Sequence, residues 1–86
     1  MTTTGNETRL AYSTEEHATT DLSCAAFLMA RGHPLIRAER QPGGRCVFHF
    51  PAAAREEAQG FYSGAQVPAR AFANALRDLK TLTREL

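Results

Sequence analysis

The chain has almost no net charge, no long hydrophobic run and only two cysteines. Ten lysines and arginines are balanced by nine aspartates and glutamates, which leaves a formal net charge of +1. Such a balance provides no long-range attraction to nucleic acid or to an anionic membrane, so any attraction of that kind has to be local. The longest apolar run is about half of the ~20 residues that a membrane-spanning helix needs, and we therefore expect no membrane partner.

The scarcity of cysteine bears on the cellular compartment. Cys24 falls in an apolar helical run and Cys46 in a strand-like run, so both are expected to be buried free thiols. Residues 1–4 have neither the basic start nor the apolar stretch of a signal peptide. Together these features predict a cytoplasmic protein.

At 86 residues the chain is long enough for one domain. Residues 1–18 read as a flexible N-terminal tail, in which residues 9–13 could add a short strand because Leu10 and Tyr12 fall on one side. Residues 19–86 form the predicted domain. A core of this size seldom contributes more than ~3–5 kcal/mol, and small domains often recruit a partner chain for that reason.

The clearest feature that is present is a predicted helix over residues 22–30. Thr20 is its expected N-cap, and Asp21 places a carboxylate at the positive end of the helix dipole. Gly32 fits a left-handed cap at the other end, and Pro34 forbids continuation. A helix that is apolar on nearly every face has to be covered by other elements, so we expect it at the centre of the domain.

A β-hairpin follows, with strand-like runs at 35–40 and 45–50 joined by the turn sequence 41–44. A loop of two or four residues would pair Ile36 with His49 and Ala38 with Val47. A loop of three residues with Gly44 left-handed instead gives the pairs Ile36–Phe50, Ala38–Phe48 and Arg40–Cys46. We favour the second register because it gathers the apolar side chains on one face, and the residues then facing outward are Arg37, Glu39, Val47 and His49.

Two further helices complete the predicted α+β fold, a helix–hairpin–helix–helix domain with the helices on one face of a short antiparallel sheet. One begins at Pro51 and ends near Ser63, where Gly64 closes it. The other begins at Pro68, and its apolar stripe consists of Phe72, Ala75, Leu76, Leu79, Leu82 and Leu86. With this helix and the first helix on the hairpin, the expected core is Leu22, Ala26, Met29, Ile36, Phe48, Phe50, Phe61, Phe72, Leu76 and Leu79.

The residues able to bind metal or perform catalysis do not form a recognisable site. Cys24, His33, Cys46 and His49 could be imagined as zinc ligands, but Cys46 and His49 lie three apart on one strand and so point to opposite faces. Ser63 does not have the strand-to-helix context of a hydrolase nucleophile, and Gly43-Gly44 is a turn that no helix follows directly. We therefore expect no metal, no cofactor and no enzymatic activity.

The basic residues form a more suggestive pattern. Arg70, Arg77 and Arg84 recur every seven positions on the last helix, and Lys80 broadens that stripe. Arg40 and Arg45 flank the hairpin tip. Such a surface could contact phosphates, although charged side chains often merely solvate the outer face of an amphipathic helix, and Asp78 and Glu85 dilute this one.

Several segments resemble a family of small bacterial and phage-borne proteins classed as a domain of unknown function. They are residues 19–22, 25–28 with Gly32, 47–50, 61–64 and 72–80, within a resemblance that covers about residues 12–82. The resemblance implies the same fold and a prokaryotic or prophage origin, and it implies no activity. Its polar members, Asn74 with Arg77 and Asp78, mark either an interaction surface or a helix-face ion pair.

The sequence thus supports two binding hypotheses. The first is a non-enzymatic accessory module that binds a protein partner, with a homodimer formed by strand pairing at the apolar edge Cys46, Val47, Phe48, His49 and Phe50, because an uncovered strand edge tends to pair. Residues 9–13 are the alternative cover for that edge. The second hypothesis is nucleic-acid binding through the candidate contacts Arg40, Arg45, Arg70, Arg77, Lys80 and Arg84.

Overall fold

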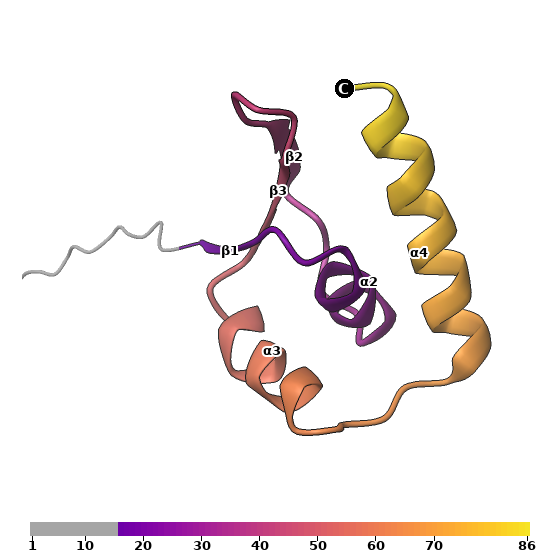
Figure 1. Ribbon diagram of the computed structural model, residues 1–86. Coiled ribbons are helices and arrows are strands. Elements are labelled where there is room, and N and C mark those ends of the chain that lie inside the picture. Colours follow the sequence, from indigo (N-terminus) through magenta and orange to yellow (C-terminus); the bar gives the residue numbers. More distant parts are fainter. Residues whose placement is uncertain (1–15) are drawn as a thin grey trace, which may run out of the picture.

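The computed structural model of the chain describes residues 16–86 and confirms a small α+β domain. A helix, a hairpin and two more helices follow one another in the predicted order, and a short strand precedes them (Figure 1). The elements are β1 (His17–Thr19), α2 (Leu22–Ala30), β2 (Arg37–Arg40), β3 (Cys46–Phe50), α3 (Ala54–Tyr62) and α4 (Ala69–Arg84).

The hairpin has the favoured three-residue loop. Ala38 lies opposite Phe48, and Arg40 lies opposite Cys46. Gly43 and Gly44 have φ angles of 97° and 93°, a left-handed region that residues with a Cβ rarely adopt. The turn is closed by the Gly44 amide, which donates to the Gln41 carbonyl at 2.9 Å. The turn residues therefore fix which side of the sheet each strand residue faces.

The sheet has three antiparallel strands in the order β1-β3-β2, so β3 lies in its centre. Strand β1 pairs His17 with Phe50 and Thr19 with Phe48. The boundary predicted at residue 18 is thus wrong, because two residues assigned to the tail belong to the sheet. Only Thr20 and Asp21 separate β1 from α2, so the chain that enters this helix is held beside β3. The other predicted third strand, 9–13, lies outside the described residues.

Helix α2 has the predicted bounds but a different N-cap. The N-cap is Asp21 rather than Thr20: its backbone is extended, and its Oδ1 accepts a hydrogen bond from the Cys24 amide at 3.1 Å. At the other end Gly32 has a φ of 99°, with its amide donating to Met29 and the next amide donating to Leu28, both at 3.0 Å. This pair of bonds is the Schellman motif that the glycine predicts.

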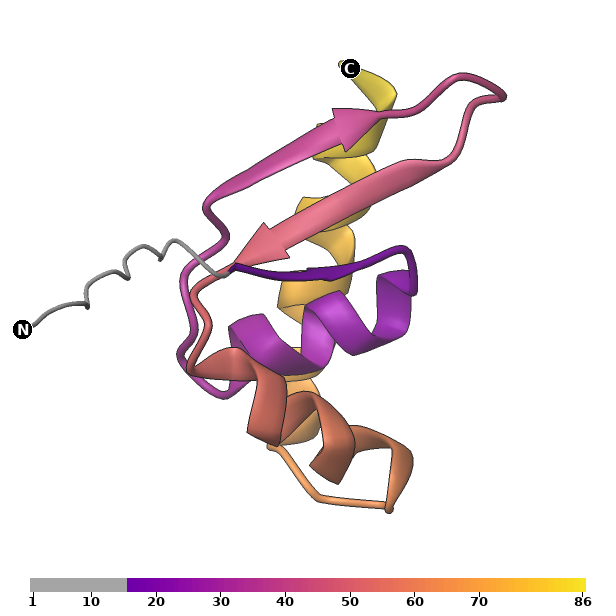
Figure 2. The same ribbon diagram turned by 90° about the vertical axis from the view of Figure 1, so that its left-hand side faces the viewer.

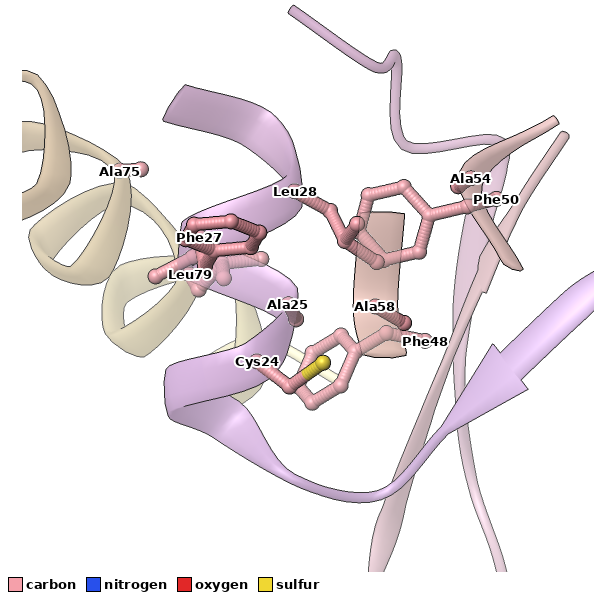
Figure 3. Packing of buried hydrophobic residues seen from close by; sticks show 11 residues of the cluster. Cys24, Ala25, Phe27, Leu28, Phe48, Phe50, Ala54, Ala58, Ala75 and Leu79 are labelled. Atoms are coloured by element: carbon pink, nitrogen blue, oxygen red, sulfur yellow. The ribbon is translucent and has the colours of Figure 1, made fainter. Parts of the chain in front are cut away.

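Helix α2 lies between the sheet and α4, as Figure 1 shows. Phe48 and Phe50 point from β3 toward one side of α2, while Ala75 and Leu79 of α4 pack on another side (Figure 3). The buried core consists of Cys24, Ala25, Ala26, Phe27, Leu28, Phe48, Phe50, Ala54, Ala58, Ala75 and Leu79. The expected central position of α2 is confirmed, whereas α4 packs mainly on α2 and not, as predicted, on the hairpin.

The predicted core is confirmed at some positions and wrong at one. Leu22, Met29, Phe61, Phe72 and Leu76 are only half-buried and pack against the buried cluster. Ile36 is 46% exposed, because it precedes the edge strand β2, and Leu35 packs against the core instead.

Helix α3 begins at Ala54, three residues later than Pro51 predicts, since residues 51–53 form a tight turn first.

Candidate nucleic-acid interface

Helix α4 separates an apolar face from a basic face. Ala75 and Leu79 are buried against α2, whereas all four basic residues of the stripe are exposed: Arg70, Arg77, Lys80 and Arg84. At about 100° per residue, these four cations fall within an arc of roughly 80° on the helix surface. With a rise of 1.5 Å per residue, Arg70 and Arg84 lie roughly 21 Å apart along the axis. The stripe is therefore a single narrow band of positive charge.

Arg40 connects this band to the hairpin. Its Nη2 donates to the Thr83 carbonyl at 2.6 Å, and its Nη1 donates to the Gly44 carbonyl at 2.9 Å. The register places Arg40 opposite Cys46 and two residues from Ala38, so its side chain lies on the helix side of the sheet. A cation near the last carbonyls of a helix is also favoured by the helix dipole. The two groups of basic residues therefore meet at the C-terminal end of α4.

The sixth predicted contact, Arg45, is exposed at the hairpin tip beside the turn. Figure 2 shows the hairpin extending alongside the C-terminal half of α4, which brings the tip and the end of the helix to the same end of the molecule. The structure thus brings Arg40, Arg45 and Arg84 to one end of the domain, while Arg70 lies at the other end of α4.

A cavity of about 330 Å³ opens where the hairpin and α4 meet. Its residues come from the entry to α2, both strands of the hairpin and the last turn of α4. They are Thr20, Leu22, Arg40, Cys46, Phe48, Thr83 and Arg84. Sequence reasoning identified the two arginines but missed Thr20, Leu22 and Thr83 as site residues, because no local pattern links three such distant segments.

The ion pairs of the domain lie away from this surface. Glu57 of α3 pairs with Arg31, whose Nε donates to it at 2.9 Å, and with His33 at 2.5 Å. The hydrogen bonds from Arg31 and then His33 lower the pKa of Glu57 below its ordinary value. On the outer face of the sheet, Arg37 pairs with Glu16 at 2.9 Å and with Glu39 at 3.2 Å.

The candidate contacts, by contrast, have no such partners. Within residues 16–86, no carboxylate lies within 4.0 Å of the basic groups of Arg40, Arg45, Arg70, Arg77, Lys80 or Arg84. The nearest helix-face interaction is a hydrogen bond from Arg77 to the Asn74 amide oxygen at 3.2 Å, not an ion pair with Asp78. The ion pairs of residues 16–86 thus lie at α3 and on the outer face of the sheet, whereas these six cations have no carboxylate partner.

His49 lies between two carboxylates on the outer face of the sheet. Its Nδ1 lies 3.4 Å from Glu16 and its Nε2 lies 3.2 Å from Glu39, so the two carboxylates contact opposite edges of the ring. Hydrogen bonds from Arg37 and then His49 lower the pKa of Glu39. In the part of the chain that the structure describes, no three His, Cys, Asp or Glu side chains are grouped so as to hold an ion.

The remaining reactive groups are each explained by local structure. Cys24 is fully buried, and this burial raises the pKa of its thiol. The Ser63 hydroxyl donates to the Gln59 carbonyl at 3.2 Å, as expected at the end of a helix. Tyr62 donates to Asp21 Oδ2 at 2.9 Å, and this hydrogen bond raises the pKa of Tyr62 to about 12. Cys46, half-buried and free, is the thiol at the cavity.

The predicted self-association edge is covered over most of its length. Strand β1 pairs with Phe48, His49 and Phe50, while β2 occupies the other side of β3. The idea of an open edge along all of 46–50 is therefore wrong, and only Cys46 and Val47 extend beyond β1. The reason is that the segment leading into α2 supplies the missing strand.

Comparison of the chain with models of protein families, with curated proteins and with solved structures found no match. The resemblance to the small bacterial and phage-borne family therefore stays a prediction. Between residues 16 and 86, no helix has both the length and the apolar character needed to span a bilayer.

Proposed function

We propose that this protein is a non-enzymatic nucleic-acid-binding module that contacts the phosphate backbone through the basic face of α4 and the hairpin arginines. The observation that carries the proposal is the distribution of the ion pairs: within residues 16–86 they involve Arg31 beside α3 and Arg37 on the sheet, but no cation of α4. Cations without carboxylate partners can replace the counterions that surround a nucleic acid, which is the main source of sequence-independent affinity.

The size of the basic face fits a short stretch of nucleic acid. The roughly 21 Å from Arg70 to Arg84 corresponds to about six base pairs of duplex at 3.4 Å per step. Arg40 adds a charge whose position is fixed by two carbonyl oxygens. The proposed accessory role needs no catalytic group at this surface.

The test is a titration of fluorescently labelled duplex DNA with the whole chain at several salt concentrations. Three or four phosphate contacts predict a slope of about −2.7 to −3.6 in a plot of log affinity against log salt, since each contact contributes about −0.9. Arg77→Glu should weaken binding at least tenfold. Arg55→Glu makes the same change in net charge on α3 and should leave binding nearly unaltered. Failure of both duplex and single-stranded DNA to bind at low salt, or equal losses in both variants, would reject the proposal.

A second candidate function is binding of a protein partner, favoured by a different cavity. A space of about 400 Å³ lies between α2, α3 and α4, and its apolar lining includes Phe27, Phe61, Val67 and Phe72. Apolar surface of this kind is typical of protein contacts. A second copy of the chain is the simplest such partner. Light scattering at micromolar concentration tests it, because a particle of 9.4 kDa would exclude the homodimer.

A further inference from the structure

The cavity between the hairpin and α4 combines an apolar bottom with a cationic rim. Leu22, Cys46 and Phe48 contribute apolar surface, whereas Arg40 and Arg84 contribute guanidinium groups. Its volume of about 330 Å³ is at the small end of the roughly 300–1,000 Å³ that ligand sites span, and it is large enough for one flat ring system. An anionic ligand with one flat ring would match both parts of the cavity.

The two arginines are suited to different parts of such a ligand. Arg40 is held by the Thr83 and Gly44 carbonyls, so the plane of its guanidinium is fixed and offers a face on which a ring can stack. Arg84 forms no side-chain hydrogen bond or ion pair with residues 16–86. Its fork of donors is therefore available for a phosphate group.

The position of the cavity relates it to the rest of the basic face. Arg84 is both the last member of the stripe and part of the cavity rim, so a strand whose phosphates follow α4 reaches the cavity at the end of the helix. The bases of a duplex are held in the stack, and taking one out has an energetic cost that a single strand does not incur to the same extent. The cavity is thus accessible mainly to an unpaired base.

We propose that the hairpin–α4 cavity takes up one unpaired nucleobase, with the adjacent phosphate on Arg84, and so gives the protein a preference for single-stranded nucleic acid. This inference rests on the proposed function, since it assumes that the strand is held by the basic face of α4. It goes beyond phosphate binding because it names the form of nucleic acid and the place where the base lies. No exposed aromatic platform is required, since stacking is supplied by the fixed arginine.

Cys46 provides a direct test because its thiol lies at the cavity while Cys24 is fully buried. Alkylation of the folded protein with N-ethylmaleimide should attach a bulky group at Cys46 and fill the cavity. Affinity for a labelled oligothymidine should then fall about tenfold, which is within the range measured when one base–aromatic stack is removed. Affinity for a duplex should stay unchanged. Cys46→Ala treated with the same reagent is the matched control and should bind the single strand as the untreated variant does.

A second measurement needs neither a modified nor a mutated protein. The rate at which N-ethylmaleimide alkylates Cys46, followed by mass spectrometry, should fall at least fivefold when oligothymidine is bound and should be unaffected by duplex. Thymidine monophosphate at millimolar concentration shows whether a free nucleotide suffices. Protection by the monophosphate as well as by the strand would support the same cavity, with the rest of the strand adding affinity.

The results separate failure of this inference from failure of the proposed function. Duplex binding together with an unaltered single-strand affinity after alkylation would overturn the inference alone. The same conclusion follows if bound oligothymidine leaves the alkylation rate of Cys46 unchanged. If neither form of DNA binds the untreated protein at low salt, the proposed function is rejected and this inference with it.

Discussion

At the scale of single residues, burial distinguishes two phenylalanines that the sequence treats alike. Phe48 is 2% exposed between the sheet and α2, whereas Phe72 is only half-buried at the edge of the apolar cavity between the helices. Both belong to an apolar face with the correct periodicity. Periodicity identifies the face that points inward but not how completely another element covers it.

Truncation of these two side chains should therefore have unequal effects. Phe48→Ala leaves a cavity in the centre of the core and should lower the free energy of unfolding by about 3–5 kcal/mol. Phe72→Ala removes a side chain that is already partly hydrated and should lower it by about 1–2 kcal/mol. Urea denaturation of both variants measures the difference. Equal urea midpoints would contradict the arrangement in which the other elements cover only part of the apolar stripe of α4.

At the scale of elements, the sequence predicts best where a local signal is strong. The bounds of α2 follow from an apolar run closed by Gly32, and the hairpin register follows from Gly43 and Gly44. Strand β1 has no such signal, because the one apolar residue among its three, Ala18, is the exposed one. Its pairing is decided by its proximity to β3, which only the tertiary structure reveals.

The candidate site, too, could be predicted from the sequence only where a local signal is present. The cations of α4 could be identified from their spacing, since an amphipathic helix has to place them opposite its apolar stripe. The register also places Arg40 on the helix side of the sheet. What the sequence could not reveal is the meeting of Arg40 with the end of α4, because Thr83 lies 43 residues away in the chain. Nor could it reveal the cavity, whose residues come from separate elements.

The N-terminus of α2 offers a test at this scale, because the sequence and the structure assign its cap to different residues. Asp21→Ala removes the acceptor for the Cys24 amide and the partner of the Tyr62 hydroxyl. It should lower the free energy of unfolding by about 0.5–2 kcal/mol. Thr20→Ala removes the neighbouring polar side chain without removing the cap and should change stability by less than about 0.5 kcal/mol. Thermal unfolding of both variants decides between them, and a larger loss in Thr20→Ala would reassign the cap.

At the scale of the whole molecule, three groups with lowered pKa values make the stability of the domain depend on pH in the acidic range. Burial, followed by the charge of Arg55, lowers the pKa of His17 below its ordinary value of 6.5. The pKa values of Glu39 and Glu57 are lowered below 4.5 by hydrogen bonds, from Arg37 and Arg31 first. In all three cases the unfolded chain binds the proton more readily than the folded chain does. Stability must therefore rise with pH wherever these groups titrate.

The expected profile has two acid steps. Above pH 6.5 all three groups are deprotonated in both states and their contribution is complete. As the pH falls below 6.5, protonation of His17 in the unfolded chain begins to favour unfolding, and this loss ends below the lowered folded pKa. A second loss begins near pH 4.5 as the carboxyl groups of Glu39 and Glu57 take up protons in the unfolded chain. Urea midpoints measured between pH 3 and pH 8 would reveal both steps.

Two variants assign the steps to their groups. His17→Gln should remove the decline just below pH 6.5 and leave the lower one, because glutamine takes up no proton there. Glu57→Gln should weaken only the decline below pH 4.5, since it removes a carboxyl group that Arg31 and His33 hold in its charged form. A profile whose stability increases on acidification would contradict the direction of all three shifts. Because α4 and its cations take no part in these ion pairs, the same substitutions should leave the salt dependence of nucleic-acid binding unchanged at neutral pH.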